Sequence, residues 1–270
     1  MGTNTITFIG GGNMARSLIG GLITDGYDPS LIRVADPDAE ARGWFSKQFG
    51  LHSTSDNPDA AQGSDVVVMA VKPQALQSVA QELADTLQES SALVITIAAG
   101  IRETDLNRWM GGGLAVVRAM PNTPALVQSG ATALYANPQV SEQQKDLAES
   151  ILRAVGLTLW LEDESQMDAV TALSGSGPAY FFLVMEALQA AGEQLGLPAD
   201  SARLLTLQTA FGSAKMALES AEDVAVLRQR VTSPGGTTEQ ALKVLEQGNM
   251  RTLWLEALQA AQRRSKELAD

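Results

Sequence analysis

The chain has 270 residues, of which 45% are hydrophobic and 19% charged, a globular composition long enough for two domains. Its formal net charge of −12 argues against binding to nucleic acid or acidic membranes, which require a basic face. The absence of cysteine excludes disulfides, thiolate nucleophiles and cysteine-ligated metal sites, and we expect no bound metal. Without a signal-peptide pattern or a membrane-length apolar run, the chain is expected to be soluble and cytoplasmic.

The N-terminal segment has the pattern of a dinucleotide-binding domain. A short β-like run at residues 5–9 leads into Gly10-Gly11-Gly12-Asn13-Met14-Ala15, which has small residues where the G-x-G-x-x-G/A motif requires them. A helix begins directly afterwards. A second strand, residues 32–35, ends at Asp36, where a carboxylate suits the hydroxyls of an adenosine ribose. The segment therefore predicts a dinucleotide site; the alternative is a glycine turn that only packs a helix on a strand.

Helical and β-like segments alternate through the first half of the chain. Expected helices span residues 39–49, 74–87 and 142–155, and expected strands span residues 52–55, 66–71, 93–97, 115–120, 131–135 and 158–161. This order predicts right-handed crossovers and a mostly parallel sheet. Because ligands bind beyond the carboxyl ends of parallel strands, one crevice is expected to be lined by Gly10, Asp36, Val71-Lys72-Pro73, Ala98-Ala99-Gly100 and Pro121-Asn122.

The second half has only helical periodicity. Expected helices span residues 167–173, 179–195, 202–218, 238–246 and 253–268. We therefore predict an α/β chain with a Rossmann-type dinucleotide-binding domain at residues 1–161 and an all-α substrate and dimerisation domain at residues 162–270. Stretches such as residues 202–218 are apolar on more than one face, which indicates burial against another subunit.

The segment from Val231 to Thr238 is the predicted substrate loop. Pro234 removes a backbone donor, while Gly235 and Gly236 permit positive φ and a close approach of the main chain to a ligand. Thr237 and Gln240 have the spacing of a capping box, so a helix is expected to follow. A glycine turn before a helix offers free amides and the positive end of the helix dipole, which suits a carboxylate or phosphate. The alternative is a capped surface helix that binds nothing.

The scarcity of candidate acids favours reduction of a C=N bond. Ketone reduction normally requires a positioned acid, yet the only histidine, His52, is expected at a strand end or the surface. Lys72 is expected either to shape the crevice or to bind a phosphate. An imine is basic enough to react already protonated. Glu164 is either a first-turn helix acid or a substrate contact, and the small residues from Ser174 to Gly177 either break a helix or line the cofactor end of the site.

Several segments together resemble pyrroline-5-carboxylate reductase. They are Phe8-Ile9-Gly10-Gly11-Gly12-Asn13-Met14-Ala15, Ala70-Val71-Lys72-Pro73-Gln74, Arg118-Ala119-Met120-Pro121-Asn122-Thr123-Pro124, Asp168 to Tyr180, and Val231 to Thr238. The resemblance implies reduction of 1-pyrroline-5-carboxylate to proline with NADPH or NADH. The implied cofactor contacts are Gly10, Gly12, Asn13, Met14, Asn57, Ala70, Val71, Lys72, Pro73, Ala98 and Ala99. The implied substrate contacts are Glu164 and the loop Ser233, Gly235, Gly236, Thr237 and Thr238, with the Thr238 hydroxyl near the ring nitrogen.

The resemblance also implies self-association as a homodimer, in this family often assembled into a decamer. Asp36 departs from relatives that prefer NADPH, which leaves the choice between NADPH and NADH open. Two alternatives share the domain plan. A β-hydroxyacid dehydrogenase would need a lysine shortly after Gly177, which the chain lacks. A non-enzymatic nucleotide sensor would have no use for an anion-binding loop in the helical half.

Overall fold

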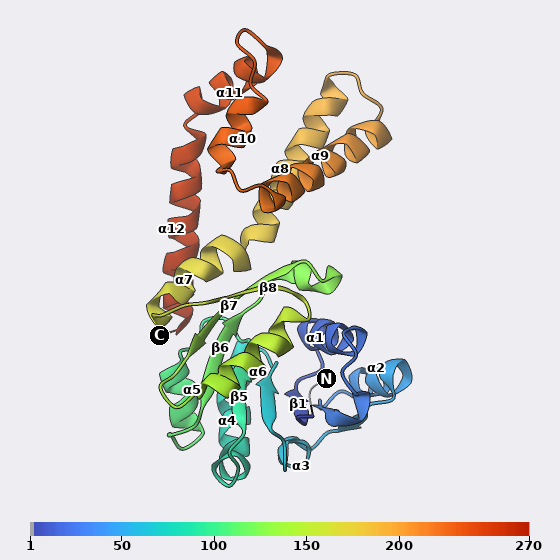
Figure 1. Ribbon diagram of the computed structural model, residues 1–270, viewed down its shortest axis with the longest axis vertical. Coiled ribbons are helices and arrows are strands. Elements are labelled where there is room, and N and C mark those ends of the chain that lie inside the picture. Colours follow the sequence, from blue (N-terminus) through green and yellow to red (C-terminus); the bar gives the residue numbers. More distant parts are fainter. Residues whose placement is uncertain (1–2, 270) are drawn as a thin grey trace. The chain divides into compact units, whose positions relative to one another are not determined.

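The computed structural model describes residues 3–269. Its elements form two compact units, residues 1–176 with 261–270, and residues 177–260. The first unit contains a twisted sheet with helices on both faces, and the second contains only helices (Figure 1). The predicted α/β class is confirmed, as is the predicted change from alternating strands and helices to helices alone.

The sheet of the first unit has the strand order of a doubly wound nucleotide-binding fold. Its strands are β1 (Ile6–Ile9), β2 (Ile32–Ala35), β3 (His52–Thr54), β4 (Val66–Met69), β5 (Leu93–Thr96), β6 (Val116–Met120), β7 (Gly130–Ala136) and β8 (Gly156–Trp160). They lie in the order β3-β2-β1-β4-β5-β6-β7-β8, so the order reverses between β1 and β4. All neighbours are parallel except β6 and β7. The crevice of such a sheet lies beyond the reversal, at the carboxyl ends of β1 and β4.

Two separate cores lie on the two faces of this sheet. On one face α1 (Asn13–Thr24), α2 (Ala39–Phe49) and α6 (Glu142–Arg153) pack against side chains such as Phe8 and Val68. On the other face α3 (Asn57–Ala61), α4 (Pro73–Gln88) and α5 (Glu103–Trp109) pack against Ile9, Val67 and Met69. Successive strand residues point to opposite faces, so both faces of the continuous apolar strands are buried. This rigid sheet positions the turns that follow β1, β4 and β5.

The short helices α3 and α5 were not predicted, because each is too brief and polar to show helical periodicity. Residues 171–175 adopt a π-helical turn between α7 (Met167–Val170) and α8 (Gly177–Gln194). The expected interruption around Ser174 is therefore a change of helix type, with Pro178 in the first turn of α8. Such π-turns occur frequently at functional sites.

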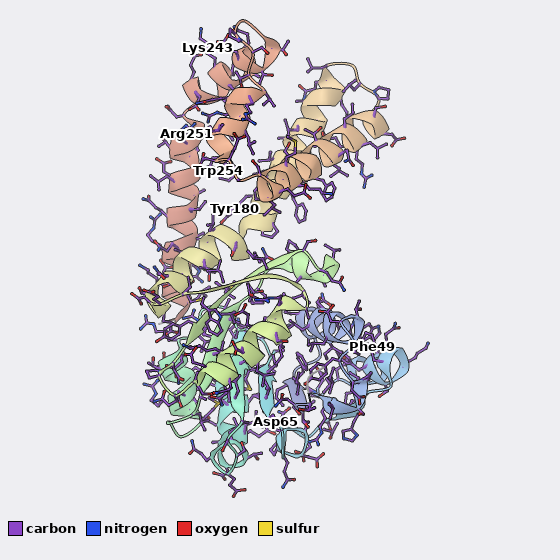
Figure 2. All side chains as sticks on the ribbon, in the orientation of Figure 1. Phe49, Asp65, Tyr180, Lys243, Arg251 and Trp254 are labelled. Carbon is purple, nitrogen blue, oxygen red and sulfur yellow. The ribbon has the colours of Figure 1, made fainter. Side chains whose placement is uncertain are left out.

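The second unit consists of α8, α9 (Ala199–Glu219), α10 (Val224–Arg230), α11 (Thr237–Gln247) and most of α12 (Met250–Ala269). The rings of Tyr180 on α8 and Trp254 on α12 lie 6.0 Å apart (Figure 2). Large apolar side chains of α8 and α9 are exposed, among them Phe181, Phe182 and Phe211. Exposed apolar surface of this kind marks an association surface. Within residues 3–269, no helix is long and apolar enough to cross a membrane.

Candidate active site

The glycine turn after β1 is built for the close approach of a ligand to the backbone. Gly10 has a φ of +102°, and a Cβ there would lie 2.8 Å from the carbonyl carbon and oxygen of Ala70, which follows β4. Gly12 is the N-cap of α1, and a Cβ there would meet open space. No side chain caps α1, so the amides of its first turn are free to bind an anion. The turn therefore fits the pyrophosphate of a dinucleotide.

Asp36 lies at the carboxyl end of β2 and contacts this turn directly. Its Oδ2 accepts a hydrogen bond from the Gly11 amide (2.7 Å), and its Oδ1 accepts one from the Asp38 amide (2.8 Å). Arg42 donates to the carbonyl oxygens of Asp36 and Pro37 at 2.7 and 2.9 Å. The Asp36 carboxylate is thus held beside the glycine turn.

The other predicted cofactor residues come after the carboxyl ends of β3, β4 and β5. Ala70 and Val71 are half-buried after β4, and Lys72 is exposed as the N-cap residue of α4. Ala98 is buried after β5, with its amide 3.3 Å from Thr96 Oγ1, while Ala99 is exposed. Asn57 begins α3 and donates to Glu82 Oε2 at 3.0 Å. His52 is exposed on the edge strand β3, in agreement with its expected surface role.

Asn122 ties the end of β6 to the π-helical turn. Its Nδ2 donates to the Ser174 carbonyl oxygen (3.1 Å), and its Oδ1 accepts from the Ala131 amide (2.9 Å). The Cβ position of Gly175 would lie 2.5 Å from Met120 Cε, which shows how closely the π-turn approaches β6. Asn122 therefore reaches from the sheet edge to the Ser174–Gly175 backbone.

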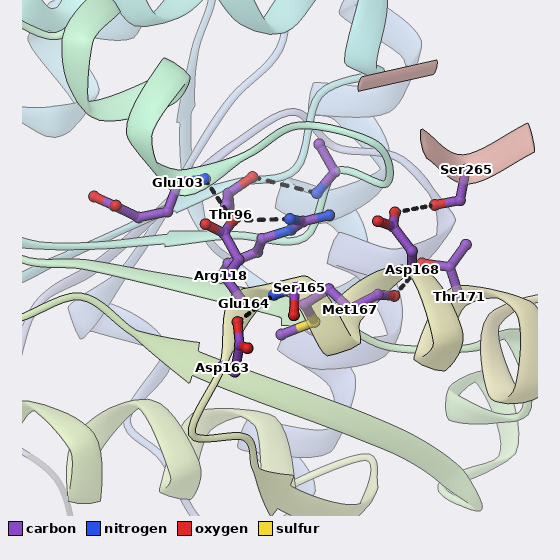
Figure 3. Close-up of polar contacts among 11 residues, drawn as sticks. Thr96, Glu103, Arg118, Asp163, Glu164, Ser165, Met167, Asp168, Thr171 and Ser265 are labelled. Carbon is purple, nitrogen blue, oxygen red and sulfur yellow. Dashed lines mark hydrogen bonds and ion pairs between the residues drawn. The ribbon is translucent and has the colours of Figure 1, made fainter. Parts of the chain in front are cut away.

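Glu164 belongs to a buried polar cluster (Figure 3). Its Oε1 accepts from Arg118 Nη1 on β6 (2.8 Å) and from the Glu103 amide at the start of α5 (2.7 Å). The Arg118 side chain is only 6% exposed. Burial, reinforced by the charges of Glu164, Glu103 and Asp163, raises the pKa of the nearby Tyr135. The sequence did not single out this role of Arg118.

A second contact in the same figure involves the C-terminal turns of α12. Ser265 is buried and donates to Asp168 Oδ1 on α7 at 2.7 Å, while Thr171 donates to the Met167 carbonyl oxygen at 2.8 Å (Figure 3). The Ser265–Asp168 bond ties the last part of the chain to the segment that enters the π-turn, and the Thr171 bond lies within that segment.

The predicted substrate loop is a tight turn ahead of α11. Gly236 donates to the Ser233 carbonyl oxygen at 3.0 Å, and Gly235 has a φ of +72°. Proline at the second position and a positive-φ glycine at the third are the signature of a type II turn. The predicted capping box is wrong, because Gly236 and not Thr237 is the N-cap and no side chain caps the helix. Within residues 3–269 the amides of Thr237 and Thr238 and the Thr238 hydroxyl have no hydrogen-bond partner.

Two family models match the chain. Residues 5–100 match the family "NADP oxidoreductase coenzyme F420-dependent", and residues 164–268 match "Pyrroline-5-carboxylate reductase dimerisation". The second match covers the all-helical part of the chain, including the loop before α11.

Similar proteins cover the chain from end to end. It is 52% identical to a pyrroline-5-carboxylate reductase of Pseudomonas aeruginosa, over 100% of this chain and 98% of the relative. The solved pyrroline-5-carboxylate reductase of Coxiella burnetii is 54% identical, with a TM-score of 0.96 and full coverage of both chains. The Plasmodium falciparum enzyme, solved with NADP bound, is 31% identical, with a TM-score of 0.88 and 100% coverage of both chains. With full-length similarity of this degree, the chain belongs to the pyrroline-5-carboxylate reductase family.

Proposed function

We propose that this chain reduces 1-pyrroline-5-carboxylate to L-proline with NADPH or NADH, the final step of proline biosynthesis, in the cytoplasm. The observation that carries the proposal is the Ser233–Gly236 turn, which leaves the Thr237 and Thr238 amides unpaired at the start of α11. A carboxylate is the group that such amides bind best. Membership of the family supplies the reaction class.

The proposed cofactor site is the crevice at the carboxyl ends of β1, β2, β4 and β5. Its proposed contacts are Gly10, Gly12, Asn13, Met14, Asp36, Asn57, Ala70, Val71, Lys72, Pro73, Ala98 and Ala99. The uncapped first turn of α1 and the open space at Gly12 support a pyrophosphate there. When bound, the nicotinamide supplies a hydride to the imine carbon.

The proposed substrate contacts are Glu164, Ser233, Gly235, Gly236, Thr237 and Thr238. The backbone donors of the loop would hold the ring carboxylate, and the Thr238 hydroxyl would orient the ring nitrogen and stabilise the amine that forms. Glu164 Oε1 is already bound to Arg118 and to the Glu103 amide, so a contact with substrate would involve Oε2. No strong acid is required, because the imine enters already protonated.

We also propose that the chain functions as a homodimer, further assembled into a decamer. Residues 1–161 would bind the cofactor, and residues 162–270 would bind the substrate and form the dimer. The match of residues 164–268 to a dimerisation family and the exposed apolar side chains of α8 and α9 support self-association. Light scattering of the purified protein tests this part: a monomer at micromolar concentration would contradict it.

The reaction is tested by following oxidation of NADPH and NADH with three substrates. We expect turnover with pyrroline-5-carboxylate, a much higher KM for 1-pyrroline, which lacks the carboxylate, and no turnover with a 2-oxo acid. Reduction of the 2-oxo acid alone would instead indicate a hydroxyacid dehydrogenase.

Replacing Thr238 by alanine is expected to lower kcat/KM by about 10- to 100-fold, because one hydrogen bond in the transition state is worth roughly 1 to 3 kcal/mol. Thr238→Ser keeps the oxygen and should recover most of the rate. The cofactor Kd should hardly change in either variant. Steady-state kinetics against pH provide the sharper check, since the profile should follow protonation of the substrate imine in all three proteins. Complete inactivity of Thr238→Ala would mean that an essential acid acts through this position.

Replacing Asp36 by serine is expected to shift the kcat/KM ratio toward NADPH by roughly 10-fold or more. The carboxylate would repel a 2′-phosphate, and repulsion between unit charges about 4 Å apart costs about 1 to 4 kcal/mol, depending on how far solvent screens it. Parallel titrations with NADPH and NADH measure the ratio. Asp36→Asn serves as the control, because it removes the charge but retains an oxygen that can accept from the Gly11 amide. A ratio that stays constant in both variants would mean that the 2′-phosphate is bound elsewhere.

A further inference from the structure

The turn before α11 is held in place by a side chain that the proposed chemistry does not use. The Gly235 amide donates to Glu239 Oε2 at 2.7 Å. Glu239 is the acidic residue in the first turn of α11. This bond is additional to the one within the turn, where Gly236 donates to the Ser233 carbonyl oxygen.

The bond differs from an ordinary helix cap. In a capping box the acid at this position of the helix accepts from the N-cap amide. Here the N-cap is Gly236, and Glu239 reaches one residue further back, to the amide of the left-handed Gly235. The first-turn acid of α9, Asp200, makes no comparable bond in the described part of the chain. Glu239 therefore binds the turn itself and not merely the end of its own helix.

We propose that Glu239 is a positioning residue for the substrate carboxylate, an inference that rests on the proposed function. By binding the Gly235 amide, its carboxylate fixes the peptide between Pro234 and Gly235. The turn is then fixed in the geometry that leaves the Thr237 and Thr238 amides free. A turn that is ordered before binding does not have to be ordered by the substrate, which strengthens binding without any contact to the ligand.

The negative charge of Glu239 has the opposite effect on substrate binding from the ordering of the turn. A second carboxylate close to the substrate carboxylate repels it, and this repulsion weakens binding. An amide in place of the Glu239 carboxylate would keep an oxygen acceptor for Gly235 and remove the repulsion. The two contributions are therefore separable by the choice of substitution.

The experiment compares Glu239→Ala, Glu239→Gln and the control Asp200→Ala with the unmodified protein. We expect Glu239→Ala to raise the KM for pyrroline-5-carboxylate about 3- to 10-fold, as for the loss of one hydrogen bond, with kcat within about twofold. Glu239→Gln should have a KM equal to or below that of the unmodified protein. With 1-pyrroline, which lacks the carboxylate, all four proteins should have the same KM. Asp200→Ala removes the same charge from another helix start and should change nothing.

Several results would overturn the assignment: an unchanged KM in Glu239→Ala, an equal change with both imines, or a Glu239→Gln variant as impaired as Glu239→Ala. Thermal unfolding of each variant shows whether a change of KM accompanies loss of structure, and a rise confined to the carboxylate substrate is not expected from general destabilisation. Failure of the unmodified protein to turn over pyrroline-5-carboxylate would contradict the proposed function instead. The two failures are thus distinguishable.

Discussion

Replacing Arg118 by alanine is expected to lower the free energy of unfolding by about 3 to 5 kcal/mol, the usual cost of removing one partner of a buried ion pair. Arg118 lies on β6 with its side chain 6% exposed, and its Nη1 lies 2.8 Å from Glu164 Oε1. Without the guanidinium, the Glu164 carboxylate keeps the Glu103 amide as a donor but loses the charge of Arg118. Urea-induced unfolding at neutral pH measures the loss.

A surface pair provides the control for this prediction. Arg108 and Asp105 lie 2.7 Å apart, but the Arg108 side chain is 71% exposed, so Arg108→Ala should cost at most about 1 kcal/mol. The double variant Arg118→Met with Glu164→Gln removes both charges, keeps an acceptor for the Glu103 amide, and should recover much of the stability. If Arg118→Ala lowers the free energy of unfolding no more than Arg108→Ala does, the buried pair does not stabilise the fold.

Most of the sheet was predictable because its strands are buried on both faces. Continuous apolar runs such as Val66–Met69 stand out against the amphipathic helices between them, and the Gly10–Ala15 motif identifies the first strand, turn and helix. The direction of β7 was not predictable, since it depends on how the Thr123–Val127 segment returns the chain to the sheet. Periodicity describes each strand by itself and contains no information about its partner.

The candidate site shows the same limit. The places of Gly10 and Asp36 directly after β1 and β2 could be predicted, because each residue follows an apolar strand in the sequence. The pairing of Arg118 with Glu164 joins residues that are far apart in sequence. A charged residue inside the buried run Val116–Met120 was nevertheless a signal, because an arginine there requires a partner. The capping box was wrong because the Ser233–Gly236 turn ends at Gly236, so the helix begins one residue earlier than a Thr237 cap would require.

Replacing Gly10 by alanine is expected to be the most damaging small substitution for cofactor binding. Its φ of +102° is unfavourable for any residue with a Cβ, and that Cβ would lie 2.8 Å from the carbonyl carbon and oxygen of Ala70, which cannot move without disturbing the end of β4. Strained backbone and overlap each cost about 1 to 3 kcal/mol, so we expect a loss of about 2 to 5 kcal/mol in unfolding free energy. Displacement of the turn should also raise the Kd for NADPH and NADH more than about 10-fold.

Gly43→Ala is the matched control, because it adds the same methyl group within α2, where the described residues place no atom outside the local helix backbone within 4 Å of the new Cβ. Alanine favours a helix over glycine by about 0.5 to 1 kcal/mol, so this variant should be slightly more stable, with an unchanged cofactor Kd. Urea unfolding and fluorescence titration of both variants measure the contrast. Wild-type cofactor affinity in a folded Gly10→Ala variant would show that the pyrophosphate does not rely on the close approach of the β1 and β4 backbones, and would move the cofactor contact away from this turn.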